Sequence, residues 1–139
     1  MAGEEPMGEP VLTGLLFADR LAQEIGGKWS ISGTFSVFQT PQVPASFPPW
    51  YIYAAVANLD GDHTFTLNLA HDQTSHVALS VSGTFRVNEP KFGIELAIPV
   101  FQCVFPHFGD YNLVLLIDNQ PVGGRILEVR QAAPRTGQA

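Results

Sequence analysis

The chain has 139 residues and a formal net charge of −6, with 14% charged and 45% hydrophobic residues. This length fits one domain, and the apolar content excludes a chain that is disordered throughout. The seven Lys and Arg residues form no basic run, which argues against nucleic acid and anionic membrane surfaces as partners. A surface with so little charge favours a protein partner or a homo-oligomer.

The single cysteine, Cys103, excludes an intrachain disulfide and suits a reducing compartment. The acidic N-terminal segment lacks the basic region of a signal peptide, and no apolar run reaches the ~18 residues of a membrane span. We therefore expect a cytoplasmic protein. Flexible tails at residues 1–10 and 131–139 are expected to flank one domain over residues 11–130.

The first predicted element, residues 11–22, has apolar residues at both odd and even positions, so both faces of an extended strand would be apolar. It could be a strand that is covered on both faces, or one or two helical turns. We favour a strand because Gly14 weakens a helix and because the next break is the Gly26–Gly27 pair.

An octapeptide occurs twice: SISGTFSV at residues 30–37 and SVSGTFRV at residues 80–87, with six identical positions. The alternation places Ser and Thr on one face and apolar residues on the other. Gly33 or Gly83 falls on the inward face, where it leaves room for a neighbouring aromatic ring or marks a bulge. We interpret the copies as strands that meet one steric requirement near each other in the fold. The alternative is a decayed duplication, although the flanking sequences match poorly.

A Pro-rich loop at residues 39–49 precedes the aromatic segment PPWYIYAAV. Tyr51 and Tyr53 share one face of this strand, and Trp50 lies on the other. The segment is therefore either a central strand with a wet rim or a contact surface, because Trp and Tyr concentrate at interface centres. The interface candidates are Phe47, Pro48, Trp50, Tyr51 and Tyr53.

Alternating apolar residues continue to the end of the chain, in short runs bounded by Gly, Pro, Asn and Asp. DGDH at residues 60–63 predicts a hairpin turn, since Gly61 adopts positive φ at little cost. We expect Tyr111 to be a corner residue whose hydroxyl bonds to upstream backbone. A closing hairpin is expected to follow it. The pattern predicts an all-β, single-domain antiparallel β-sandwich, immunoglobulin-like or jelly-roll-like, with about 7–9 strands.

No motif in the chain points to catalysis. Cys103 lies inside an apolar strand, which argues against a reactive thiolate, and no Gly-rich phosphate loop precedes a helix. His71, Asp72 and His76 are the best candidates for a ligand or metal site, but their spacing matches no zinc motif. We expect no cofactor and no enzymatic activity.

Two longer segments carry a family resemblance. LLFADRLAQEIGGKWSISGTFSVFQTPQVPASFP contains a Gly-Gly-Lys turn, a Gly-x-Phe strand and a Pro-rich loop, and FPHFGDYNLVLLIDNQPVGGRILEV contains Phe, then Gly-x-Tyr, then an Asp-bearing hairpin. Over residues 11–130 this pattern resembles an uncharacterised family of bacterial β-sandwich domains. The resemblance implies the fold and a non-enzymatic role, but it supplies no site residues.

The sequence thus favours a non-catalytic protein-binding or self-assembly module. Two alternatives remain open at this point. One is a ligand- or metal-binding sandwich with a site near His71, Asp72 and His76, and the other is a structural subunit of a shell or phage-like particle.

Overall fold

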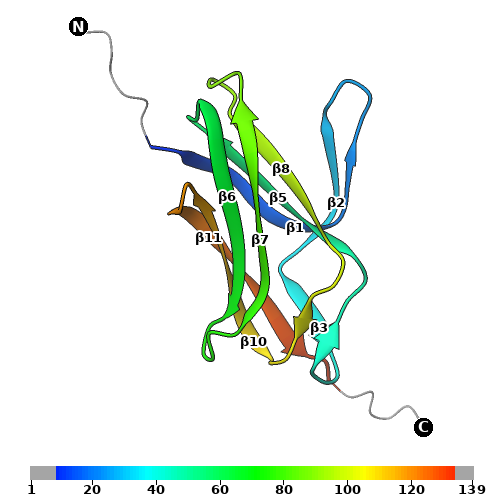
Figure 1. Cartoon of the computed structure of the whole chain (residues 1–139). Coiled ribbons are helices and arrows are strands. Elements are labelled where there is room, and N and C mark those ends of the chain that lie inside the picture. The colour runs from blue at the N-terminus through cyan, green and yellow to red at the C-terminus, as the bar shows by residue number, and fades with distance from the viewer. Residues whose placement is uncertain (1–8, 134–139) are drawn as a thin grey trace, which may run out of the picture.

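The computed structural model describes residues 9–133, which form two β-sheets packed face to face (Figure 1). The predicted tails, residues 1–10 and 131–139, lie largely outside the described residues. The first sheet is antiparallel, in the order β2–β1–β5–β8. Its strands are β1 (Val11–Gln23), β2 (Trp29–Phe35), β5 (Trp50–Ala57) and β8 (Ile94–Val100).

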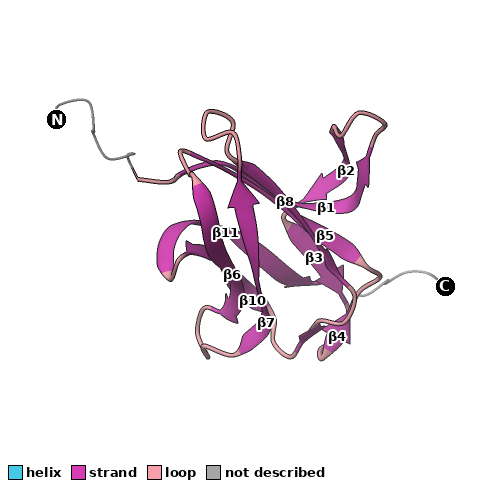
Figure 2. Cartoon of the chain, turned by 45° about the horizontal axis from the view of Figure 1, so that its top comes forward, coloured by secondary structure: helices cyan, strands magenta, loops and turns pink. Residues whose placement is uncertain are grey.

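The second sheet has the order β3–β11–β10–β6–β7. Its strands are β3 (Val37–Thr40), β6 (Gly61–His71), β7 (Val77–Val87), β10 (Gly109–Ile117) and β11 (Gln120–Gln131). A short pair, β4 (Ala45–Ser46) and β9 (Val104–Phe105), lies apart from both sheets in the pairing order. Figure 2 shows strands and loops, and no helix in residues 9–133 is long and apolar enough to cross a membrane.

The predicted all-β sandwich is confirmed, and residues 11–23 are a strand. Two details differ from the prediction. The described residues contain eleven strands rather than about 7–9, because the β4–β9 pair was missed and one predicted strand is divided at Ser36. The sheets are also not wholly antiparallel, since β3 runs parallel to β11.

The core follows from the period-two alternation. Every second residue of β10 faces the opposite sheet and is almost completely buried: Tyr111, Leu113, Leu115 and Ile117. The Tyr111 hydroxyl donates to the His107 carbonyl over 3.0 Å and accepts from the His107 N–H over 3.1 Å. The predicted corner role of Tyr111 is therefore confirmed.

Two of the turns expected from the sequence are present in the structure. β10 and β11 form the predicted closing hairpin, and its two-residue turn has positive φ at both Asp118 (51°) and Asn119 (66°), as a type I′ turn requires. Gly61 has a φ of 81°, so the turn at DGDH is present. It is not a hairpin, however, because β5 and β6 belong to different sheets and this turn carries the chain from one sheet to the other.

The β1–β2 hairpin extends away from the body of the sandwich, and we call residues 19–33 the arm (Figures 1 and 2). Ile25 in its turn is fully exposed. β2 is the edge strand of the first sheet and β7 is the edge strand of the second. Residues 30–35 of the first octapeptide copy therefore lie in the first sheet, whereas the second copy lies in the second sheet, which corrects the expectation that the copies are neighbours.

Candidate functional site

The predicted contact segment divides between the core and the surface. Trp50 is only 2% exposed, and its ring packs edge-on against Phe17 (5.9 Å), Phe35 (5.9 Å) and Phe38 (5.5 Å) between ring centroids. Phe47 is half-buried and stacks on Phe38 with centroids 4.0 Å apart. Both residues stabilise the interior. The prediction that Trp50 forms an interface is therefore wrong, and the stacking of Phe47 on Phe38 argues against the same prediction for Phe47.

The other candidates of this segment lie at the surface. Pro48 is exposed, and Tyr51 and Tyr53 are half-buried on the outer face of the first sheet. The Tyr53 hydroxyl donates to the Glu95 carboxylate. Burial, followed by the hydrogen bond and the negative charge of Glu95, raises the pKa of Tyr53 to about 12. These tyrosines remain interface candidates, but Tyr53 is already bound to a side chain of its own sheet.

His71 does not form the predicted ligand site. It is 5% exposed, its Nε2 lies 2.9 Å from the Phe108 carbonyl, and its Nδ1 accepts the Thr74 N–H over 3.2 Å. Because a carbonyl can only accept, Nε2 donates to Phe108 and Nδ1 is the acceptor. Both ring nitrogens are thus occupied, and residues 9–133 contain no group of three or more His, Cys, Asp or Glu that could hold a metal ion. The described residues therefore offer no metal site near His71, Asp72 and His76, which corrects the metal part of that hypothesis.

Cys103 is buried, and burial raises the pKa of its thiol to about 11. Its Sγ lies 3.5 Å from the Ala78 carbonyl at the start of β7. The thiol is therefore protonated near neutral pH and would be a poor nucleophile. Its contact shows that the segment after β8 returns to the first residues of β7.

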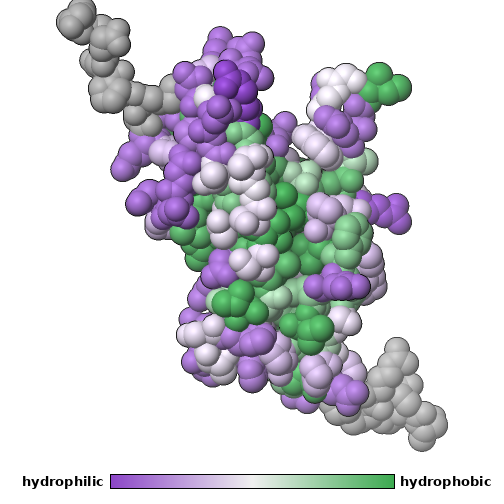
Figure 3. All heavy atoms as spheres, in the orientation of Figure 1, coloured by the Kyte–Doolittle hydropathy of each residue, from purple (hydrophilic) through white to green (hydrophobic). Residues whose placement is uncertain are grey.

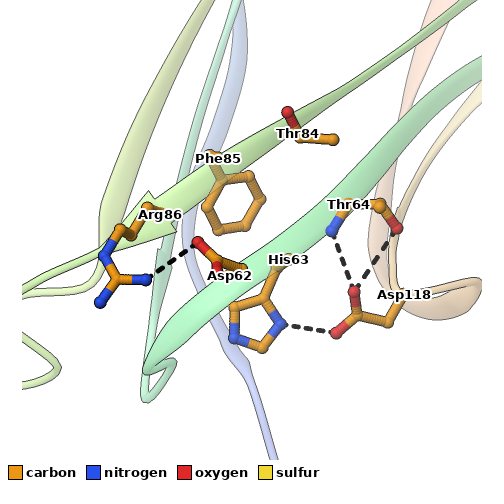
Figure 4. A pocket seen from close by; sticks show the side chains of 7 residues that line it. All are labelled: Asp62, His63, Thr64, Thr84, Phe85, Arg86 and Asp118. Atoms are coloured by element: carbon orange, nitrogen blue, oxygen red, sulfur yellow. Dashed lines mark hydrogen bonds and ion pairs between the residues drawn. The ribbon is translucent and has the colours of Figure 1, made fainter.

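Two shallow hollows adjoin at the end of the sandwich where β6 begins, with volumes of about 510 and 330 Å³. Both hollows are lined by His63 and Asp118, and Figure 4 shows these two side chains in the first hollow. His63 Nδ1 lies 2.6 Å from Asp118 Oδ2, and Nε2 lies 2.8 Å from the Asp60 carbonyl. Both partners accept, so these contacts favour the doubly protonated ring of His63.

The charges in these hollows neutralise one another. The hydrogen bond to Asp118 is the main cause that raises the pKa of His63, and hydrogen bonds from the Thr64 N–H and from His63 lower the pKa of Asp118. Arg86 pairs with Asp62 over 3.1 Å. No cation or carboxylate drawn in Figure 4 is left without an opposite charge. We therefore interpret His63 and Asp118 as a clamp that holds the β5–β6 and β10–β11 turns together.

The side of the sandwich between β7 and β8 is different, because its inward-facing side chains are incompletely covered. In β6, the neighbour of β7, inward residues such as Leu67 and Leu69 are fully buried. Three inward residues of β7 and two of β8 remain half-exposed although they face the interior, whereas Val87 at the end of β7 is buried. The half-exposed residues are Leu79, Val81, Phe85, Ile94 and Ile98. We call these residues the open side. Figure 3 shows apolar surface along this side, where β7 passes β8.

Exposed apolar residues frame the open side at both ends. Phe92, in the connection from β7 to β8, is 73% exposed, and Phe101, directly after β8, is 64% exposed. Val104 and Val77 lie close to the Cys103–Ala78 contact and are about half exposed. These four are half of the exposed large apolar side chains in residues 9–133. Contiguous exposed apolar surface is typical of interaction sites, which makes this side a candidate.

The open side is bordered by two edge strands that differ in protection. β8 carries Pro99 and Glu95, and an edge proline or charge hinders pairing with another strand. β7 has neither proline nor charge from Leu79 to Phe85, and within the described residues it pairs only with β6. Alternate residues of β7 between Leu79 and Phe85 therefore direct unpaired N–H and C=O groups away from the sheet. This edge is the best candidate for a binding site.

Sequence reasoning missed this site because β7 and β6 show the same alternation, although one is an edge strand and the other is central. Pro99 is the one usable signal, since proline within a strand is typical of an edge. It would have identified β8 as an edge strand. Nothing comparable in the sequence marks β7.

The comparisons with known proteins concern the fold and the family. The structure is similar to Pseudomonas fluorescens alkylpurine DNA glycosylase AlkC, bound to DNA containing an abasic site analog, with a TM-score of 0.47 and 10% identity. That match covers 88% of this chain but only 30% of the glycosylase chain. The structure is also similar to an immunoglobulin-like protein from Pseudomonas aeruginosa, with a TM-score of 0.43, 9% identity, and coverage of 91% of this chain and all of that one.

No curated protein matches the chain. Residues 14–130, which include the arm, the open side and both sheets, match the model of a family described as a family of unknown function (DUF6941). This agrees with the resemblance to an uncharacterised β-sandwich family. The chain belongs to the family of unknown function DUF6941.

Proposed function

We propose that this chain is a non-catalytic protein-binding module that takes up an extended strand of a partner along β7. The observation that carries the proposal is the unprotected β7 edge beside half-exposed inward residues such as Val81 and Phe85. A strand added to an open edge gains main-chain hydrogen bonds, and its alternate side chains can cover an apolar surface. One added strand would therefore satisfy the free backbone of β7 and cover the open side.

The state of the titratable groups supports a non-catalytic role. The thiol of Cys103 has a raised pKa, and the ring nitrogens of His71 and His63 are occupied by protein partners. Cys103, His71 and His63 are among the groups that could otherwise act as a nucleophile or a general base. In their present contacts they contribute to structure.

The test is selection of random peptides displayed on phage against the full chain, followed by calorimetry and amide chemical shifts of the bound peptides. We expect selected peptides with alternating apolar residues, and we expect the largest shifts in β7 and β8. A library that yields no binder, or binders that shift only other strands, would contradict the proposal.

The repeated octapeptide supplies a matched control. Val81 and Ile31 occupy equivalent positions in the two copies, and both lie on edge strands. Val81→Lys places an inward-pointing charge on the β7 edge and should weaken peptide binding at least about tenfold, which corresponds to ~1.4 kcal/mol. Ile31→Lys, in the arm, should leave binding unchanged. Equal affinities for the two variants would remove β7 from the site.

A further inference from the structure

We infer that the partner strand is β7 of a second copy, paired antiparallel about a two-fold axis at Ser82. The inference rests on the proposed strand uptake along β7 and adds the identity of the strand. Self-pairing is isologous, so the same surface must complement itself when residue i meets residue j. With Ser82 on the axis, residue i of one copy pairs with residue 164 − i of the second copy.

The inward face of β7 satisfies this requirement. Val81 would lie opposite Gly83 of the second copy, so that a branched side chain meets a position without one. Within its own chain the space beside Gly83 is occupied by Phe65, since a Cβ on Gly83 would lie 2.9 Å from Phe65 Cε1. Val81 of the second copy would pack against this ring edge. Leu79 would meet Phe85 of the second copy, an aliphatic–aromatic pair that stabilises neighbouring strands.

The outward face is equally self-complementary. Ser80 would lie opposite Thr84 of the second copy, and Ser82 opposite itself, so that hydroxyl groups meet hydroxyl groups. Such pairs hydrogen-bond across neighbouring strands. Arg86, the one charged residue of β7, would meet Ala78 and stays paired with Asp62 of its own chain. No like charges oppose each other.

Other centres for the axis are less favourable. An axis at Gly83 would place two glycines opposite each other and would lose side-chain contact at the centre. An axis at Val81 would draw in Val77 and Ala78, where the β6–β7 ladder has a register shift. Ser82 is the centre that uses the regular stretch from Leu79 to Phe85 on both copies.

Paired in this way, two second sheets would become one continuous sheet of ten strands. The contact between two seven-residue stretches is smaller than a standard interface, so we expect weak association. Light scattering should show a dimer as the concentration approaches about 1 mM, where an association of ~4 kcal/mol is half complete. A mass that stays monomeric at this concentration would overturn the inference.

Cysteine cross-linking tests the register. Leu116, Thr66 and Ser82 lie in one row across β10, β6 and β7. Strands lie about 4.8 Å apart, so the inferred dimer separates the two Ser82 Cα atoms by about one spacing and the two Thr66 Cα atoms by about 14 Å. With Cys103→Ala as background, Ser82→Cys should form a disulfide-linked dimer on mild oxidation. Thr66→Cys is the matched control and should not, because a disulfide spans at most about 7 Å between Cα atoms.

A distance measurement separates the inference from the proposed function. Spin labels on Leu116→Cys should give a separation centred near 24 Å, five strand spacings, by double electron–electron resonance. A different separation, or Thr66→Cys cross-linking as readily as Ser82→Cys, would overturn the Ser82 register. If selected peptides bind along β7 but the chain stays monomeric, the second copy is excluded and the proposed strand uptake stands. Self-association that persists in Val81→Lys would overturn the second copy alone, because the proposed strand uptake is tested by peptide binding along β7.

Discussion

The two copies of the octapeptide show how far one local pattern can diverge in a fold. Residues 80–87 form one unbroken edge strand within β7, whereas residues 30–37 begin in β2 and change sheet at Ser36 to enter β3. Ser36 is held at this break, because its carbonyl accepts the Glu128 N–H over 2.9 Å and its hydroxyl accepts from Arg125 over 3.2 Å. Contacts with β11 therefore determine the break, and they come from a distant part of the chain.

The shared glycines differ in the same way. Gly33 has a φ of 71°, and its Cβ would lie 2.5 Å from the Asp19 carboxylate. Gly83 has no positive φ, and it makes room for the Phe65 ring. The expected role beside an aromatic ring is thus confirmed for Gly83 and wrong for Gly33. Gly33 thus gives the β2 edge a residue with positive φ, whereas the stretch of β7 from Leu79 to Phe85 pairs regularly with β6.

The largest difference between the copies should appear at their phenylalanines. Phe35 lies 4.6 Å from Phe38 and about 6 Å from Phe17 and Trp50 between centroids, whereas Phe85 contacts only Phe65 and His63 among the rings. Phe35→Ala should lower the free energy of unfolding by about 3 kcal/mol, and Phe85→Ala by about half as much. Urea denaturation at low protein concentration measures both. Equal losses would show that the two environments are energetically alike.

The glycines should differ in which replacement they tolerate. We expect alanine to cost about 1–2 kcal/mol of unfolding free energy at either position, through positive φ at Gly33 and through overpacking at Gly83. Asparagine tolerates positive φ, so Gly33→Asn should cost less than Gly33→Ala. At Gly83, asparagine should cost more than alanine, because the larger asparagine side chain meets Phe65. The same order at both positions, in thermal or urea unfolding, would contradict the two roles.

The clamp between His63 and Asp118 supports β6, the neighbour of β7, and β2 has no equivalent. The pKa of His63 is raised in the folded state, so its protonation stabilises the fold. This stabilisation is fully present below the unfolded pKa of about 6.5 and is lost as pH rises through the higher folded pKa. Because the pKa of Asp118 is lowered, its charge stabilises above about pH 3.9, and this is lost as pH falls through the lower folded pKa.

Asp118→Asn keeps a residue suited to positive φ and removes the charge. It should cost at most about 1 kcal/mol, since the pair is partly exposed, with the largest loss between about pH 4 and 6.5. Urea denaturation across this range measures it. A loss that is independent of pH would mean that Asp118 acts only through its hydrogen bonds in the turn.

The smallest effect is expected in the arm. Ile25 is 104% exposed relative to the reference state, so Ile25→Ser should change the free energy of unfolding by less than about 0.5 kcal/mol. The same variant should leave the light-scattering mass unchanged, because the inferred contact lies at β7. A dimer that disappears with Ile25→Ser would move the interface from β7 to the arm.

Much of the fold was predictable because alternation is written into each segment. The inward sets of β6, β7, β8 and β10 follow from their sequences, and so do the two-residue turn at Asp118 and the corner at Tyr111. The candidate site was less predictable. Trp50 carries the residue type of an interface but fills the core, because Phe17, Phe35 and Phe38 converge on it from three other strands.

The amino-acid sequence by itself determined the extended segments, the face that each side chain takes and the family to which the chain belongs. These properties depend on neighbours in the chain, since successive side chains of a strand point to opposite sides. Only the tertiary structure decided where the chain changes sheets and which strand is left at an edge. Those outcomes depend on pairing between distant segments, and the unprotected side of β7 exists because no other strand within residues 9–133 pairs there.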